Sequence, residues 1–168
     1  MTNKYHATPY DISATGFYFS TYEEYVEKAA THKNEYGDPV EEYEIQFIDG
    51  DNYQLFNALG VNQANLNQWF DDFEVLDDDD SNKATYLAEY SGYSDMNDIL
   101  SNMDDVQLFE GTALEYAEEY IEATGMLNDM PENLRYYFDT EAFARDMVLG
   151  GDISVVEVNG STYVAWGG

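Results

Sequence analysis

An acidic run in the middle of the chain is the first candidate for chemistry, because its spacing resembles a calcium-binding loop. Four residues match positions 1, 3, 5 and 12 of an EF-hand loop: Asp78, Asp80, Asn82 and Glu89. Position 6 of such a loop needs glycine for its sharp turn, and this sequence has Lys83 there. Carboxylates also favour the positive N-terminal end of a helix. We therefore expect Asp77–Asp80 to begin a helix, and we expect no bound metal and no other cofactor.

Residue patterns for catalysis are absent from the sequence. The two histidines, His6 and His32, have no nucleophile at a recognisable spacing, and there is no glycine-rich phosphate-binding loop or HExxH zinc motif. Carboxylate pairs for acid–base chemistry are so common in this chain that any two would fit. The chain has no cysteine, which excludes disulfides, thiolate metal sites and thiol chemistry. We therefore predict that the protein is not an enzyme.

Two arginines are the other charged residues of interest. Arg135 and Arg145 are the only arginines in the chain, and both lie in its last third. We expect them to form internal salt bridges, with anion binding as the less favoured alternative. The candidate partners are Asp139, Glu141 and Asp146. Arg145 is also a candidate for a contact across a subunit interface.

A helix with an unneutralised acidic stripe is predicted over Gly111–Gly125. Thr112 is a suitable N-cap, and Gly125 stands where a helix commonly ends in a left-handed residue. The residues that recur at helical spacing on the inner side are Leu114, Ala117, Ile121 and Thr124. The acids that recur on the outer side are Glu115, Glu118, Glu119 and Glu122. Like charges at this spacing cost a few tenths of a kcal/mol per pair, so the stripe opposes the helix that carries it.

The spacing of this stripe resembles the spacing of phosphates in DNA. At about 1.5 Å rise per residue, the four carboxylates span roughly 10.5 Å, or about 3.5 Å per charge. Phosphates along one strand of B-form DNA lie about 3.4 Å apart on its axis. A merely solvated acidic face has the same pattern, so the rest of the chain has to separate the two interpretations.

The overall charge favours a basic protein surface as the partner. The chain of 168 residues carries 35 Asp and Glu against 6 Lys and Arg, a formal net charge of -29, yet 44% of its residues are hydrophobic and 16% aromatic. This composition is too apolar for a disordered tail, so we expect a fold with its charge outside. Nucleic acid and anionic membranes would repel such a surface. A surface that normally grips nucleic acid would accept it, and charges at about 1.7 Å each would replace roughly 50 Å of duplex.

No segment of the sequence predicts secretion or insertion into a membrane. The N-terminal residues have no apolar core of signal-peptide length. No apolar run approaches the roughly 20 residues that a membrane-spanning helix needs. We therefore expect a cytoplasmic protein.

The periodicity of the chain predicts an α+β fold in three small parts. Residues 1–50 combine strand-like stretches with one helix, as in a small antiparallel sheet covered on one side. From Asp51 the apolar period changes from two to about 3.6, and residues 51–105 are typical of a cluster of short helices. Residues 106–168 begin with a short strand and continue with helices and a hairpin. The clearest buried stripe lies in Asn62–Glu74, where we expect one helix with these residues inward: Leu66, Trp69, Phe70 and Phe73.

A β-hairpin is predicted at the end of the chain. Asn159 and Gly160, between two alternating β-rich runs, are a strong signal for a two-residue turn. In that register Val155 pairs with Val164 on one apolar face, and the other face is partly apolar too. A small sheet that is apolar on both faces either packs helices on each side or pairs with another subunit. The candidates for a dimer interface are therefore Arg145, Val156, Val158 and Tyr163.

Two parts of the chain resemble the ArdA antirestriction proteins. The run LRYYFDTEAFARDMVLGGD and the preceding AEEYIEATGMLNDMP are similar to the C-terminal signature of that family and the segment that leads to it. EEYEIQFID resembles the family's central strand, and GFYFSTYEEY resembles its N-terminal strand and helix. The resemblance covers Ala113–Gly151 and Gly16–Asp49. It implies a curved, elongated protein of three small domains that imitates bent B-form DNA and dimerises through its C-terminal domain. It also implies competitive occupation of the DNA groove of Type I restriction–modification enzymes, with no chemistry done.

The charge pattern and the resemblance together predict a DNA mimic in the cytoplasm of a host bacterial cell. Its partner would be a DNA-binding protein complex with a basic groove, and neither nucleic acid nor membrane would bind it directly. The residues expected to stand in for phosphates are Glu23, Glu24, Glu27, Asp71, Asp72, Glu74, Asp77, Asp78, Asp79, Asp80, Asp95, Asp98, Asp104, Asp105, Glu115, Glu118, Glu119 and Glu122. A mimic that inhibits another nucleic-acid machine, such as a CRISPR effector complex, is the close alternative. A halophile-adapted acidic binding domain and a cation buffer are alternatives of other classes.

Overall fold

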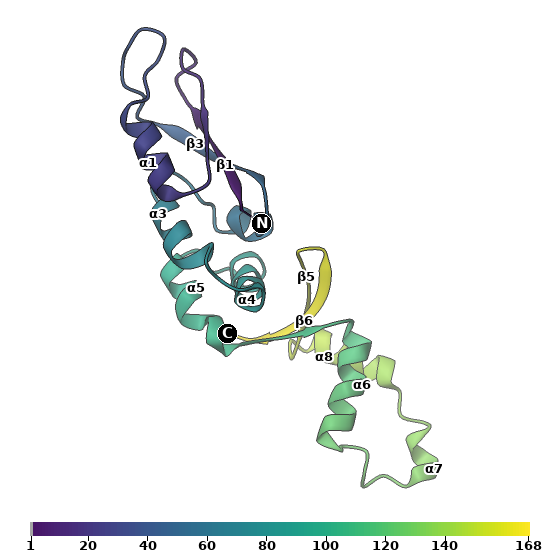
Figure 1. The fold of residues 1–168 in the computed structure, drawn as a ribbon. Helices are drawn as coiled ribbons and strands as arrows, with labels where there is room; N and C mark the ends of the chain where they lie inside the picture. The colour runs from purple at the N-terminus through teal and green to yellow at the C-terminus, as the bar shows by residue number, and fades with distance from the viewer. Residues whose placement is uncertain (1) are drawn as a thin grey trace.

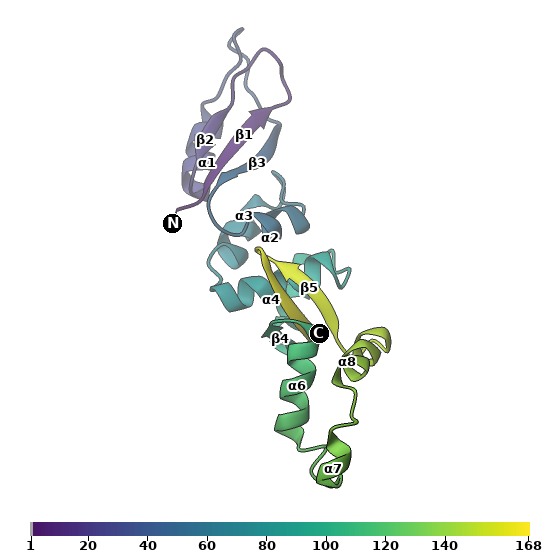
Figure 2. The same ribbon diagram turned by 90° about the vertical axis from the view of Figure 1, so that its right-hand side faces the viewer.

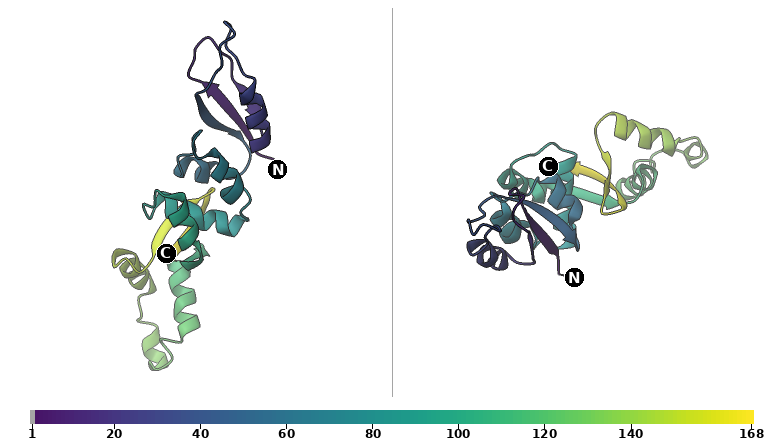
Figure 3. Two further views of the ribbon diagram at one scale, coloured as in Figure 1. Left: turned by 90° about the vertical axis from the view of Figure 1, so that its left-hand side faces the viewer. Right: turned by 90° about the horizontal axis from the view of Figure 1, so that it is seen from above.

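The computed structural model describes residues 2–168 and shows an elongated molecule of the α+β class (Figure 1). Two three-stranded antiparallel sheets lie along its length, with short helices between and around them. The N-terminal sheet lies at one end and the short helix α7 (Glu132–Arg135) lies at the other, as the left view of Figure 3 also shows. The predicted fold class is therefore confirmed. No helix in the described part of the chain is long and apolar enough to span a membrane.

The N-terminal sheet has the strand order β2-β1-β3 and is covered on one face by a helix. Its elements are β1 (Lys4–Pro9), β2 (Phe17–Phe19), α1 (Tyr22–Ala30) and β3 (Tyr43–Asp49). Alternate residues of a strand face opposite sides, so Tyr5 and Ala7 are fully buried while Lys4 is exposed. The helix begins where the Thr21 hydroxyl accepts a hydrogen bond from the Glu24 amide at 3.1 Å.

Short helices form the middle of the molecule. They are α2 (Tyr53–Ala58), α3 (Leu66–Gln68), the π-helical turn η1 (Trp69–Phe73), α4 (Asp78–Glu89), α5 (Met96–Asn102) and the 3-10 turn η2 (Met103–Asp105). The prediction of a single helix over Asn62–Glu74 is wrong at both ends of that range. Asn62 Oδ1 accepts hydrogen bonds from the amides of Ala64 and Asn65, which favours a turn over a helix. The end widens into η1. Of the four predicted inward residues, Leu66, Trp69 and Phe73 are fully buried and Phe70 is half-buried.

The last third of the chain forms the second sheet and the helices beside it. Its elements are β4 (Val106–Glu110), α6 (Ala113–Thr124), α7, α8 (Thr140–Leu149), β5 (Ser154–Val158) and β6 (Ser161–Gly167). The predicted hairpin register is confirmed, because Val155 pairs with Val164. Asn159 and Gly160 have φ of 50° and 82°, the positive values that this two-residue turn requires. The strand order is β4-β6-β5, so β4 adds an edge that the hairpin pattern alone did not predict.

Both faces of the C-terminal sheet are packed within a single chain. A continuous core runs from the N-terminal sheet through the middle helices to the face that carries Val156 and Val158. Met147, Ile153 and Val164 form a second, smaller core on the opposite face, with Tyr116 and Trp166 packed against it. Of the two arrangements that the apolar faces predicted, the chain therefore adopts packing on each side. The division into residues 1–50, 51–105 and 106–168 stays a prediction.

This packing corrects the predicted dimer interface. Val156 is 2% exposed and Val158 is 0% exposed within one chain, so neither offers a surface to a second copy. Tyr163 packs against the same core, and its hydroxyl accepts a hydrogen bond from Asn82 Nδ2 at 3.2 Å. The alternation of the hairpin showed that this face is apolar, but it did not show that the middle helices cover it. Arg145 alone among the predicted interface residues is exposed.

Candidate protein-binding surface

The predicted acidic stripe lies on the outer face of α6. The Thr112 hydroxyl accepts a hydrogen bond from the Glu115 amide at 3.1 Å, and the Glu115 carboxylate accepts one from the Thr112 amide at 3.3 Å. This reciprocal capping box begins the helix, and Gly125 ends it with a φ of 63°. Ala117 is buried on the inner side, whereas all four acids of the stripe are exposed. The helix runs along the long axis of the molecule (Figure 2), so the stripe runs along it too.

The inner face of α6 differs in part from the predicted one. Leu114 and Ile121 are half-buried as expected for a surface helix, but Thr124 is exposed. The main contact comes from Tyr116, whose ring centroid lies 4.8 Å from that of Trp166. The inner face is therefore rotated toward Tyr116, and it holds α6 against the C-terminal sheet.

A second acidic group lies at the start of α4. As predicted, the run Asp77–Asp80 begins a helix: Asp77 is the N-cap, and its carboxylate accepts a hydrogen bond from the Asp80 amide at 2.8 Å. The residues that matched an EF-hand lie on a continuous helix, so they do not line a loop around an ion. Within the described residues there is no group of three or more acids and histidines arranged to hold a metal. Lys83 neutralises part of the run, since it lies 3.0 Å from Asp79, and this hydrogen bond raises the pKa of its ammonium group.

The remaining predicted acids are spread over α1, η1, α5 and η2. Asp95 caps α5 by accepting hydrogen bonds from the amides of Asn97 and Asp98 at 2.7 and 3.2 Å. Glu24 is half-buried and lies 3.9 Å from Lys28. Asp72 is half-buried as well. The others of this set are exposed: Glu23, Glu27, Asp71, Asp95, Asp98, Asp104 and Asp105.

Glu74 is the exception among the predicted acids, because the structure places it, half-buried, at the junction between β1 and the middle helices. Its carboxylate accepts a hydrogen bond from the Tyr5 hydroxyl at 2.8 Å, and that hydroxyl accepts one from Trp69 Nε1 at 2.9 Å. Burial raises the pKa of Glu74, although the hydrogen bonds lower it in part. Its position after Asp71 and Asp72 indicated the outer face, but the π-helical turn η1 brings it round to β1. Glu74 is therefore removed from the candidate binding residues.

The acidic surface is almost free of neutralising bases. Of the 18 acids predicted to mimic phosphates, 14 are exposed, four are half-buried and none is fully buried. Residues 34–134 contain 26 acids and one base, Lys83. In the described part of the chain two salt bridges form, Lys28–Glu24 and Lys83–Asp79. This arrangement suits a basic partner, because most of the negative charge is exposed and has no salt-bridge partner among the described residues.

The arginines do not form the predicted salt bridges. Arg135 donates hydrogen bonds to the carbonyls of Met130 and Asn128 at 3.0 and 2.9 Å. It therefore closes the loop between α6 and α7 instead of pairing with an acid. Within residues 2–168, Arg145 forms no salt bridge and is exposed.

The C-terminal lobe, which we define as residues 113–149, carries several exposed apolar side chains. Tyr136, Tyr137 and Leu149 are 88%, 83% and 77% exposed. Their hydrophobicity alone would predict that such residues are buried, so no sequence pattern indicated that they lie on the surface. The lobe is thus acidic along α6 and apolar around α7 and the end of α8.

Comparisons with known proteins point to one family. A family model described as "Antirestriction protein (ArdA)" matches residues 6–160 of the 168. No curated protein matches the chain. The match spans both sheets, the middle helices and the acidic helix α6.

Proposed function

Since this chain belongs to the ArdA family of antirestriction proteins, we propose that it acts by imitating DNA. It occupies the DNA-binding groove of a Type I restriction–modification enzyme in the host cytoplasm and thereby excludes the DNA itself. It is not an enzyme, and it needs no cofactor. The single observation that carries this proposal is the nearly unneutralised acidic surface of residues 34–134 on an elongated fold.

The chemistry of the groove explains why such a surface binds. A protein that grips duplex DNA presents Lys and Arg side chains already arranged for phosphates about 3.4 Å apart along each strand. The exposed stripe of α6 offers carboxylates at about 3.5 Å per charge along the helix axis. The partner therefore needs little rearrangement, and electrostatic steering speeds the encounter.

The protein acts as a homodimer in this proposal, joined through its C-terminal lobe. The exposed apolar side chains Tyr136, Tyr137 and Leu149 support this, because aromatic residues are enriched where protein surfaces meet. A dimer would place two acidic chains end to end and lengthen the surface that is presented to the groove.

Competition with duplex DNA tests the proposed function. A Type I enzyme is bound to a labelled oligonucleotide that contains its recognition site, and the protein is added in increasing amounts. We expect stoichiometric displacement of the DNA and loss of cleavage. A variant with Glu118, Glu119 and Glu122 replaced by Gln should displace less DNA. The proposal fails if the protein leaves DNA binding by the Type I enzyme unchanged, including the case in which it inhibits only a CRISPR effector complex.

A further inference from the structure

A side chain of α2 and the residue that follows α4 bind the main chain of the terminal hairpin at the edge strand β5. Gln54 Nε2 donates a hydrogen bond to the Glu157 carbonyl at 2.8 Å, and Gln54 Oε1 accepts one from the Asn159 amide at 2.7 Å. The same Gln54 amide group also donates to the Glu89 carboxylate on α4. One side chain from the middle helices thus bridges α4 and two residues of the hairpin.

A tyrosine completes this arrangement. The Tyr90 hydroxyl donates to the Glu157 carbonyl at 3.1 Å and accepts from the Glu157 amide at 3.2 Å. Glu157 lies on the outer edge of β5, where a further strand would normally satisfy these two groups. Gln54 and Tyr90 therefore form the hydrogen bonds at this edge that a neighbouring strand would form in a larger sheet.

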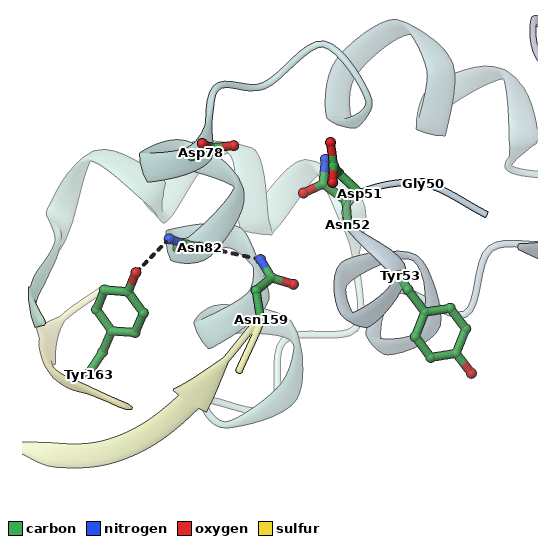
Figure 4. Close-up of a pocket in the computed structure, with 8 residues that line it drawn as sticks. All are labelled: Gly50, Asp51, Asn52, Tyr53, Asp78, Asn82, Asn159 and Tyr163. Atoms are coloured by element: carbon green, nitrogen blue, oxygen red, sulfur yellow. Dashed lines mark hydrogen bonds between the residues drawn. The ribbon is translucent and has the colours of Figure 1, made fainter. Parts of the chain in front are cut away.

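Polar contacts on the other side of the hairpin turn strengthen the junction. Asn159 Nδ2 donates to Asn82 Oδ1 at 3.1 Å, and Asn82 Nδ2 donates to the Tyr163 hydroxyl at 3.2 Å (Figure 4). These residues line a polar hollow of about 410 Å³, together with residues of the loop between β3 and α2. The hairpin is thus held against the middle helices by directional bonds on both sides of its turn.

The junction joins the elements that carry two of the acidic groups of the molecule. The helix α4 carries the run Asp77–Asp80 at its start and Asn82 and Glu89 further along. The hairpin shares a sheet with β4, which leads through Gly111 directly into α6 and its acidic stripe. A rotation of the sheet on α4 would therefore move the two acidic groups relative to each other.

From this geometry we infer that Gln54 and Tyr90 are positioning residues that set the distance between the Asp77–Asp80 run and the α6 stripe. They touch no partner themselves. They hold the hairpin in one orientation, so that both acidic groups meet the same basic groove. The consequence for binding rests on the proposed function, whereas the effect on the distance does not.

A distance measurement tests the inference without any partner. Because the chain has no cysteine, Val75→Cys and Ala123→Cys place two unique spin labels, one beside the Asp77–Asp80 run and one on α6. Both positions are exposed. We expect one narrow distance distribution in this parent by pulsed electron paramagnetic resonance. Gln54→Met with Tyr90→Phe should broaden or shift it, because both substitutions remove the bonds and nearly keep the side-chain volume.

A matched variant separates this effect from general loosening. Tyr53→Phe with Gln107→Met makes the same chemical changes at exposed residues for which no side-chain hydrogen bond is present in the described structure, and it should keep the parent distribution. An unchanged distribution in the Gln54→Met, Tyr90→Phe variant overturns the inference. If that variant does not give the circular dichroism spectrum of a folded protein, the two single substitutions are measured in its place and judged in the same way.

Binding to a Type I enzyme supplies the second readout. The Gln54→Met, Tyr90→Phe variant keeps the net charge of the parent, yet its affinity should fall about tenfold and depend less steeply on salt, because fewer carboxylates engage the groove at once. If this variant binds with the same affinity and the same salt dependence as the parent, the inference is contradicted. If the parent itself does not bind, the proposed function fails, while the distance measurement still decides the role of Gln54 and Tyr90.

Discussion

At the scale of single residues, the phenol of Tyr5 joins the N-terminal sheet to the middle helices. Its hydroxyl accepts hydrogen bonds from Trp69 Nε1 at 2.9 Å and Asn3 Nδ2 at 3.2 Å, and it donates one to Glu74 at 2.8 Å. The Asn3 side chain also accepts a bond from the Asp51 amide at 2.8 Å. Burial is the main reason why the pKa of Tyr5 is raised, so the phenol stays protonated as a donor.

Removing this hydroxyl should destabilise the fold. Tyr5→Phe leaves the Trp69 indole N–H and the Glu74 carboxylate without their partner, and an unsatisfied buried polar group costs about 1–3 kcal/mol. We expect a loss of this size in the free energy of unfolding measured with urea. Tyr36→Phe, at a tyrosine that is 73% exposed, is the control and should change the free energy very little. Equal effects of the two substitutions would show that the junction contributes nothing.

The raised pKa of Glu74 predicts a dependence of stability on pH. Because burial raises the pKa in the folded state above its unfolded value, the fold favours the protonated carboxyl. The stabilisation from Glu74 is therefore complete below the unfolded pKa and is lost as the pH rises through the folded pKa. Glu74→Gln should gain stability relative to the parent as the pH rises above the unfolded pKa of a glutamate, about 4.3. Urea unfolding at each pH measures this gain, with Glu44→Gln, at an exposed strand position, as the matched control.

At the scale of secondary-structure elements, α6 combines a strong cap with a face that repels itself. Its capping box and its glycine terminus favour the helix, whereas four like charges on one face oppose it. This conflict is expected where a surface serves binding and not stability.

Removing the charge should therefore separate stability from function. Replacing Glu118, Glu119 and Glu122 by Gln removes every like-charge pair of the stripe at spacings of three and four. We expect the free energy of unfolding to rise by roughly 0.5–1 kcal/mol, while affinity for a Type I enzyme falls. The charge-matched control replaces Glu35, Glu44 and Glu141, which are exposed and are not among the acids predicted to mimic phosphates. If the control weakens binding as much as the replacement of Glu118, Glu119 and Glu122 does, only the net charge of the protein matters for binding.

Local signals in the sequence predicted most of the elements. The turn Asn159-Gly160 fixed the hairpin register, and Thr112 with Gly125 fixed the ends of α6. The same signals also placed most of the predicted acids on the surface, because a carboxylate opposite an apolar helix face points outward.

The parts that could not be predicted depend on contacts between distant residues. The π-helical turn η1 turns Glu74 toward Tyr5, 69 residues earlier in the chain, and no local pattern indicates this. Val156 and Val158 were correctly seen as apolar, but their cover comes from the middle helices. The bonds of Gln54 to Glu157 and Asn159 span 103 and 105 residues and have no sequence signal at all.

At the scale of the whole molecule, salt should act on folding and on binding in opposite directions. A formal charge of -29 repels itself, so added salt should stabilise the fold modestly by screening. The complex with a basic groove should weaken more than tenfold between about 50 and 200 mM NaCl, because its charge pairs are screened. Circular dichroism measures the first effect and competition with labelled DNA the second. A protein that unfolds without molar salt would instead be a halophile-adapted domain.

The two tryptophans of the chain lie in different cores. Trp69 is fully buried beside Tyr5, and Trp166 belongs to the smaller core, where it lies against Tyr116. Replacing either one by Phe leaves a single tryptophan, whose emission, excited at wavelengths that the 16 tyrosines do not absorb, reports on one half of the protein. Within each variant, coincident unfolding curves from tryptophan emission and from circular dichroism would mean that the chain melts as one cooperative unit, and separate curves would mean that one part melts by itself. The two tryptophans can therefore report whether the two cores unfold together or separately.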